Sequence, residues 1–149
     1  MTRVLRRIKI ERMSSTVKAA PIALVLCDAI YQDPVGGKTA LVGLFNNISA
    51  TKFPIAHPRL AVFASVTGLR EGSHAKLEII HGETEQPIVA ASGPFPKGAT
   101  PLSVADLNFV FNNVVFPEEG TYLVRFWVND HPLMQRPFQV STVKKEKKE

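Results

Sequence analysis

The sequence contains a single cysteine, Cys27, among its 149 residues. One thiol cannot form an intramolecular disulfide, which excludes the disulfide-stabilised scaffolds of small secreted proteins. Cys27 follows the apolar run 22–26, and this arrangement resembles a lipoprotein signal. Such a signal requires a small residue before the cysteine, whereas here that residue is Leu26. We therefore expect a buried thiol that closes a core strand, and a cytoplasmic protein.

The sequence also has no long hydrophobic run and no clear helical periodicity. No segment approaches the roughly 18 apolar residues that a membrane-spanning helix requires, so we expect no membrane span. The segments between the frequent Pro and Gly residues are short and rich in Val, Ile, Phe, Thr and Leu. This pattern is typical of many short β-strands joined by turns.

Sequence signatures of catalysis are missing. There is no Gly-x-Ser-x-Gly elbow for a nucleophilic serine, and the apolar surroundings of Cys27 disfavour the reactive thiolate. The adjacent carboxylates Glu118 and Glu119 lie in a predicted turn, where such side chains are usually solvated. We therefore expect no catalytic residues and no enzymatic activity.

The segment Gly36-Gly37-Lys38-Thr39 resembles the end of a phosphate-binding loop. The full motif needs a further glycine at the position of Gln32 and a helix after the Lys-Thr pair. A strand is expected from Thr39 onward instead, and residues 33–38 carry strong turn chemistry. The pattern therefore predicts a hairpin turn and no bound cofactor.

The histidines and aspartates do not form a metal-binding pattern. No two histidines have the close spacing that brings two imidazoles to one metal ion, and no alternating Asp/Asn loop serves a hard cation. We expect no metal site. The side chains that we expect to cap turns and strand ends instead are His57, His74, His81, His131, Asp28, Asp33, Asp106 and Asp130.

The positive charge of the chain is concentrated at its two ends. The chain has a net charge of +5, yet residues 19–143 carry slightly more acidic than basic side chains. Charged, low-complexity ends are usually disordered, so we divide the chain into a basic tail 1–18, a folded domain 19–143 and a charged tail 144–149. Met13 is a natural start, and whether residues 1–12 are translated stays open.

Strands are expected wherever apolar and β-branched residues run between turn signals. The first covers 22–27 and is followed by a loop over 28–38. Further strands are expected at 39–45, 60–67, 75–80, 88–91, 102–112, 122–128 and 138–143. The strand 39–45 is apolar on both faces, which predicts a central position in a sheet. Seven or eight short strands favour a single antiparallel β-sandwich of the immunoglobulin type, with a small closed barrel as second choice.

A tight turn precedes Tyr122 at the start of an alternating strand. The turn is Phe116-Pro117-Glu118-Glu119-Gly120-Thr121, and the strand continues to Val128. In sandwich folds a tyrosine so placed often returns its hydroxyl to the backbone of the preceding corner. We therefore expect Tyr122 to form a structural tyrosine corner, with Val124, Phe126 and Val128 also facing the core.

The opposite face of the same strand carries Leu123, Arg125 and Trp127, the only tryptophan of the chain. Trp and Arg are the residue types most enriched at binding hot spots, so this row is a candidate partner surface. Two structural explanations stay open, a cation–π pair within the row or a cover by the N-terminal tail or a loop. An open edge strand is a second candidate contact, which makes self-association a reasonable expectation.

Several of these residues together resemble an uncharacterised family of small bacterial proteins, known only as a domain of unknown function. The resemblance spans most of 22–143 and implies a compact bacterial cytoplasmic domain without adding a mechanism. It rests on Leu26-Cys27-Asp28, Gly37-Lys38-Thr39 with Leu41, Gly43 and Phe45, Phe53-Pro54 with His57, and the segment from Phe116 to Tyr122.

Three functional hypotheses follow from the sequence. The leading one is a non-enzymatic protein-binding or assembly module that uses the Leu123/Arg125/Trp127 face or an edge strand. The first alternative is a weak binder of nucleic acid or another anionic surface through the basic tails, since clustered Lys and Arg attract phosphate without sequence specificity. The second alternative is a small-ligand carrier or enzyme that uses the 28–38 loop with His57.

Overall fold

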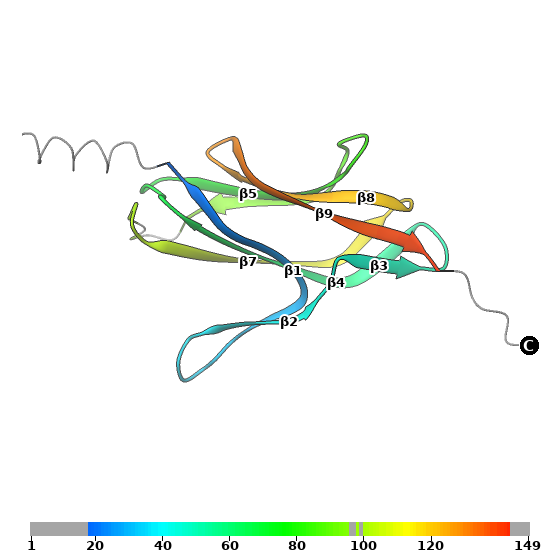
Figure 1. Cartoon of the computed structure of the whole chain (residues 1–149), viewed down its shortest axis with the longest axis horizontal. Helices are drawn as coiled ribbons and strands as arrows, with labels where there is room; N and C mark the ends of the chain where they lie inside the picture. Colours follow the sequence, from blue (N-terminus) through cyan, green and yellow to red (C-terminus); the bar gives the residue numbers. More distant parts are fainter. Residues whose placement is uncertain (1–17, 96–97, 99, 144–149) are drawn as a thin grey trace, which may run out of the picture.

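The chain is built from strands that form two sheets. The structure, a computed structural model, describes residues 18–95, 98 and 100–143, and these contain nine strands and no helix. Figure 1 shows the two sheets as layers. The strands are β1 (Ala20–Gln32), β2 (Thr39–Leu44), β3 (Asn47–Ala50), β4 (Ile55–Thr67), β5 (His74–His81), β6 (Pro87–Pro94), β7 (Val104–Phe116), β8 (Gly120–Val128) and β9 (His131–Thr142). The predicted all-β class is confirmed.

Sheet A has the strand order β2-β1-β4-β7, and sheet B has the order β3-β9-β8-β5-β6. All neighbours are antiparallel except β3 and β9, which pair in parallel. The expectation of seven or eight antiparallel strands was therefore wrong in this detail. The strand that the sequence does not predict is β3, whose four residues carry the chain from the edge of sheet A to the edge of sheet B.

The hydrophobic core draws on both sheets. Alternate residues of β4 and β8 point into it, and their side chains are fully buried, as for Leu60, Val62, Val124 and Phe126. The core-facing row predicted for 122–128 is confirmed, because the non-polar residues at even positions are buried while the odd positions are half-buried. A period of two on each strand therefore places one row in the core and leaves the other on the outside.

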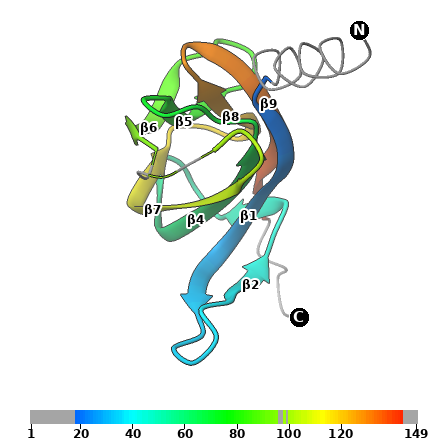
Figure 2. The ribbon, with the colours of Figure 1, turned by 90° about the vertical axis from the view of Figure 1, so that its left-hand side faces the viewer.

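The loop predicted over 28–38 is strand as far as Gln32. β1 continues to Gln32 and pairs with β2, so that only the residues from Asp33 to Lys38 make the turn, closed by a hydrogen bond from the Gly37 amide to the Asp33 carbonyl at 2.8 Å. The hairpin expected at Gly36–Thr39 is confirmed. Figures 1 and 2 show this end of the hairpin projecting beyond the other strands of both sheets, and we call residues 28–44 the arm.

The prediction that 39–45 is a central strand was wrong. β2 pairs with β1 alone and is an edge of sheet A. Its apolar side chains are exposed, with Val42 at 50% and Leu44 at 66%. A strand that is apolar on both faces can be buried between two layers, or it can lie at the edge of a sheet with its apolar side chains exposed to solvent.

Gly43 explains how the arm joins the sheet. Its φ is +74°, a conformation that residues with a side chain rarely adopt. A Cβ at this position would also collide with the carboxylate of Asp28 on the neighbouring strand. Any other residue at 43 would strain the backbone and displace Asp28, so this end of the arm depends on a glycine.

β9 begins earlier than expected, and it contains Pro132 and Pro137. Both prolines lie in the part of β9 that has β8 as its only partner, because β3 pairs solely with residues 139–142. A proline is tolerated there because its missing N–H is not needed by a second strand. The sequence prediction treated these prolines as chain breaks and so began the strand at 138.

The predicted tails, apart from Lys18, lie outside the described residues, as do the hypotheses that depend on them. Among the residues that the structure describes, none belongs to a helix that is long and apolar enough to cross a membrane.

Cys27 lies on β1 between Leu44 of β2 and Ala61 of β4 and is fully buried. Burial disfavours the charged thiolate and raises the pKa of the Cys27 thiol above its usual value. The thiol of an unfolded chain ionises near its usual pKa of about 8.5. The folded state therefore loses stability relative to the unfolded state as the pH rises from that value towards the raised pKa.

We expect the free energy of unfolding to fall more steeply between about pH 8 and pH 9.5 in the native sequence than in Cys27→Ala, because only the native sequence carries the thiol that ionises on unfolding. Urea titrations across this range measure the difference between the two slopes. Parallel curves for the two proteins would contradict the prediction.

Candidate partner-binding surface

The row of Leu123, Arg125 and Trp127 lies on the outer face of sheet B, as expected from the alternation in β8. β5 places two further side chains beside it, since Lys76 pairs with Trp127 and Glu78 with Arg125 in the register of the two strands. The row is half-buried rather than exposed. Its neighbours on β5 therefore decide how much of it another molecule can reach.

Trp127 contacts three charged side chains, those of Glu78, Lys76 and Arg125. Its Nε1 donates a hydrogen bond of 2.8 Å to Glu78 Oε1. Lys76 Nζ lies 5.5 Å from the centre of the indole ring, and the Arg125 guanidinium carbon lies 5.8 Å from it. Both distances are in the range of cation–π interactions. The cation–π explanation that the sequence left open therefore describes contacts that are present.

The charges around this row balance. Glu78 is 8% exposed, and its carboxylate lies 3.5 Å from Lys76 Nζ and 4.0 Å from Arg125 Nη1. Arg125 Nη2 also lies 3.3 Å from Glu85 Oε1. Its Nε donates a hydrogen bond of 3.3 Å to Gln135 Oε1. A partner would have to compete with these bonds. The use of Leu123, Arg125 and Trp127 as a partner surface stays a prediction.

Tyr122 makes the hydrogen bond that we expected of it. Its hydroxyl donates to the carbonyl oxygen of Glu118 at 2.6 Å, across the turn between β7 and β8. The ring packs edge-on against Phe116, with the ring centres 5.0 Å apart, and stacks on Phe138 at 5.9 Å. Burial raises the pKa of Tyr122, so the hydroxyl stays protonated and continues to donate.

His81 is a buried residue that caps the β5–β6 turn, the kind of role expected for it from the sequence. Its Nδ1 accepts hydrogen bonds from the backbone amides of Glu83 and Thr84, at 3.2 and 3.3 Å. The proton therefore lies on Nε2, which is 3.0 Å from Glu118 Oε1. The polar turn that begins at Gly82 was the only available signal for such a histidine. His81 ties the β5–β6 turn to the β7–β8 turn.

The structure does not bring His57 and the turn of the 28–38 segment together in one site. His57 contacts the ring of Phe45 at the base of the arm, with the ring centres 5.9 Å apart. The turn from Asp33 to Lys38 lies at the other end of the arm (Figure 2). No group of three or more His, Cys, Asp or Glu side chains that could hold a metal ion occurs within the described part of the chain.

The outer face of sheet A is a surface that the sequence analysis missed. A row of side chains runs across its four strands in the order Leu44, Cys27, Ala61 and Val110. The two small central residues are fully buried, whereas Leu44 and Val110 at the two ends are 66% and 46% exposed. Tyr31 adds an aromatic ring that is 58% exposed on the arm. The signal for this surface was the apolar character of both faces of β2.

Removing the Tyr122 hydroxyl tests its contribution separately from that of the ring. We expect Tyr122→Phe to lower the free energy of unfolding by about 1 kcal/mol, because the Glu118 carbonyl loses its buried donor. The matched control is Tyr31→Phe, at the other tyrosine of the chain, which is exposed and should change stability little. Urea denaturation measures both, and equal values for the two variants would contradict the prediction.

The bond between Trp127 and Glu78 is tested by a double-mutant cycle. Trp127→Phe keeps a ring in place and removes the N–H donor to a nearly buried carboxylate, which should cost about 1.5 kcal/mol. The same change in a Glu78→Gln background should cost clearly less, since the charged acceptor is already gone. Chemical denaturation of the four proteins gives the coupling energy, and additive effects would show that this bond does not stabilise the fold.

Comparison with solved structures finds similarity to Pseudomonas fluorescens alkylpurine DNA glycosylase AlkC bound to DNA containing an abasic site analog. The similarity covers 90% of this chain and 36% of that chain, with 10% sequence identity and a TM-score of 0.49. The chain thus spans about a third of that protein, and similarity at this level carries no argument about function. No curated protein matches the sequence.

A family model matches residues 22–141, which is nearly the whole of the described domain. The match begins within β1 and ends within β9, so it includes both sheets and the arm. It confirms the resemblance to an uncharacterised domain. The chain belongs to DUF6941, a family of unknown function.

Proposed function

We propose that the protein is a non-enzymatic assembly module in which the edge of β2 pairs with β2 of a second copy. The observation that carries this proposal is that β2 is an uncharged, exposed edge strand and forms one side of the projecting arm (Figure 2). An edge strand presents unpaired backbone N–H and C=O groups, which another strand can satisfy. An antiparallel pair about a twofold axis would join two copies of sheet A.

The other edges of the two sheets are less suited to pairing. β3 has only four residues, and β6 begins and ends with a proline, which cannot donate to a ladder. β7 is long, but Asn113 interrupts it with a φ of +52°. Short strands, prolines and local distortions are the usual protection of an edge against pairing. β2 has no proline, and its distortion at Gly43 leaves the residues from Thr39 to Val42 regular.

The side chains of β2 favour a second copy as the partner. A charged residue on an edge strand opposes its own copy in a twofold pair and so prevents self-pairing. Among the residues from Thr39 to Leu44 there is no charged side chain. Val42 and Leu44 are about half or more exposed and would be covered by the same residues of the other copy. The arm extends beyond the sheets, so the bodies of the two copies need not collide (Figure 2).

We also propose that the fold is an immunoglobulin-like β-sandwich. Three features support this assignment: two sheets that share one core, a tyrosine hydroxyl bonded back to the preceding corner, and several strands that pair with distant parts of the chain. The parallel pair formed by β3 and β9 is a local addition at one edge. A reducing, cytoplasmic location is part of the same proposal and is supported by the single unpaired thiol of Cys27.

A charge on β2 tests the proposed pairing. We expect the native protein to be a dimer and Val42→Lys to raise the dimer dissociation constant at least about tenfold, because the twofold pair brings two ammonium groups together. The matched control is Val115→Lys on β7, since Val42 and Val115 are 50% and 51% exposed. Sedimentation velocity over a concentration series measures association, and circular dichroism checks the fold.

Two results would overturn the proposal. A native protein that stays monomeric throughout the concentration series would exclude self-pairing. Equal weakening by Val42→Lys and Val115→Lys would show that the contact does not depend on β2.

A further inference from the structure

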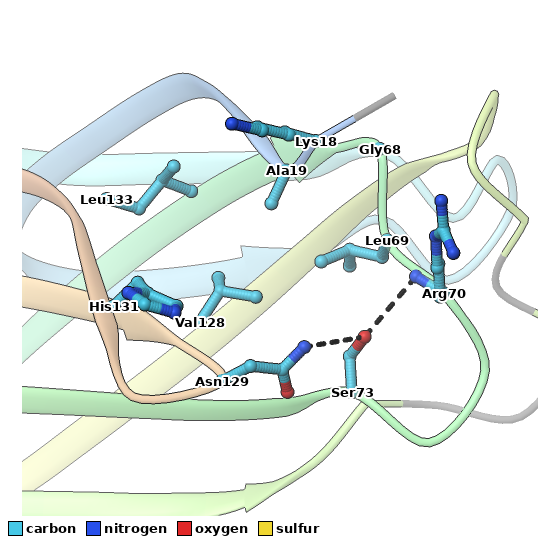
Figure 3. A pocket seen from close by; sticks show the side chains of 10 residues that line it. All are labelled: Lys18, Ala19, Gly68, Leu69, Arg70, Ser73, Val128, Asn129, His131 and Leu133. Carbon is cyan, nitrogen blue, oxygen red and sulfur yellow. Dashed lines mark hydrogen bonds between the residues drawn. The ribbon is translucent and has the colours of Figure 1, made fainter. Parts of the chain in front are cut away.

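The structure contains a cavity at the end of the core, opposite to the arm and independent of β2. Its volume is about 620 Å³, within the range of about 300–1,000 Å³ that is typical of small-molecule sites. Three segments form it: the residues that lead into β1, the turn between β4 and β5, and the turn between β8 and β9 (Figure 3). Its lining residues are Lys18, Ala19, Gly68, Leu69, Arg70, Ser73, Val128, Asn129, His131 and Leu133.

The interior of the cavity is apolar. Leu69 and Val128 are 1% and 6% exposed and belong to the main core, and Ala19 and Leu133 pack against it. Figure 3 shows these side chains around the cavity from different segments of the chain. The cavity is thus a continuation of the core towards solvent. An acyl chain placed there would be removed from water by surfaces that are already apolar.

The polar groups in the wall are satisfied by one another. Ser73 Oγ accepts a hydrogen bond from the Arg70 amide at 3.3 Å and another from Asn129 Nδ2 at 3.4 Å. Asn129 Oδ1 accepts from the His74 amide at 2.9 Å. These bonds connect the two turns that form the cavity. An apolar ligand would therefore leave none of these groups without a partner.

The two residues with permanently charged side chains that line the cavity, Lys18 and Arg70, are both basic. Lys18 and Arg70 lie on different sides of it in Figure 3, and the exposed imidazole of His131 lies on the third segment. Among the ten described residues that line the cavity there is no Asp or Glu. An apolar interior with a basic rim complements a ligand that has an apolar chain and an anionic head.

Gly68 determines where Lys18 lies. Its φ is +78°, and a Cβ there would collide with the carbonyl oxygen of Lys18. The backbone that leads into β1 can therefore pass directly over the β4–β5 turn only because residue 68 is a glycine. This close approach fixes the backbone of Lys18 beside the β4–β5 turn, and the Lys18 side chain extends from there away from Arg70, towards the side of the cavity where Leu133 lies (Figure 3).

We propose that this cavity binds a single-chain anionic amphiphile of the fatty-acid class. The acyl chain contacts Leu69, Val128 and Leu133, and the carboxylate lies at the rim near Lys18. This inference adds a ligand site to the assembly role and does not depend on it, because no residue of the arm lines the cavity.

The probe is dodecanoate, used below its micellar concentration with the full chain and followed by isothermal titration calorimetry. We expect binding of one molecule per chain. The cationic analogue dodecyltrimethylammonium has the same apolar chain and should bind at least about tenfold more weakly if the basic rim selects the head group.

Two variants place the site. Lys18→Glu should weaken dodecanoate binding at least about fivefold, which corresponds to the modest strength of an exposed ion pair. The matched control is Lys52→Glu, an exposed lysine outside the cavity, which should leave binding unchanged. Ala19→Phe should abolish binding by filling the interior, with circular dichroism to confirm that the variant is folded.

Three results would overturn the inference: no dodecanoate binding by the full chain, equal affinity for the anionic and cationic probes, or equal effects of Lys18→Glu and Lys52→Glu. The first would show that the cavity does not bind this class of ligand. None of these results bears on the dimerisation measured by sedimentation, so the two proposals fail separately.

Discussion

The corner between β7 and β8 is the last place in the chain order where the described chain passes from sheet A to sheet B, and the packing of Tyr122 holds that corner. The tyrosine ring lies against Phe116 from the end of β7 and Phe138 from β9, so one side chain contacts both sheets. Its hydroxyl then fixes the turn through the Glu118 carbonyl, and His81 reaches the side chain of the same glutamate. Because β8 pairs with both β5 and β9, the position of this corner determines how most of sheet B lies over sheet A.

The two outer faces of the molecule differ in how completely their side chains are satisfied. On sheet B, Trp127, Glu78 and Arg125 bind one another, and apolar and charged groups are balanced within the row. On sheet A, Leu44 and Val110 stand exposed beside the small buried residues Cys27 and Ala61. A residue type that is common at interfaces is therefore a weaker guide than the bonds it already makes. Trp127 has such bonds within its own sheet, whereas the apolar side chains of β2 do not.

The sequence predicts those features that depend on local pattern. The alternation around Tyr122 follows from the period of a strand, and the corner hydrogen bond follows from the spacing between Glu118 and Tyr122. Position within a sheet is a property of the whole fold, so the apolar run 39–45 predicted a central strand although β2 forms an edge. The prolines of β9 were misread for the same reason, because their cost depends on whether a second strand lies beside them. The cavity unites three segments that are distant in sequence, and no local pattern marks it.

β1 belongs to two ladders that overlap at a single residue. Its first part pairs with β4 and its last part with β2, and Cys27 alone has a partner on both sides, Ala61 and Leu44. Beyond Cys27 the arm is held by one ladder only, so its backbone bonds can open or change in number without disturbing the pairing of β1 with β4. Insertions or deletions in the turn from Asp33 to Lys38 would accordingly lengthen or shorten the arm and leave the core as it is. The arm is thus the part of this fold whose length can change while the rest of both sheets stays the same.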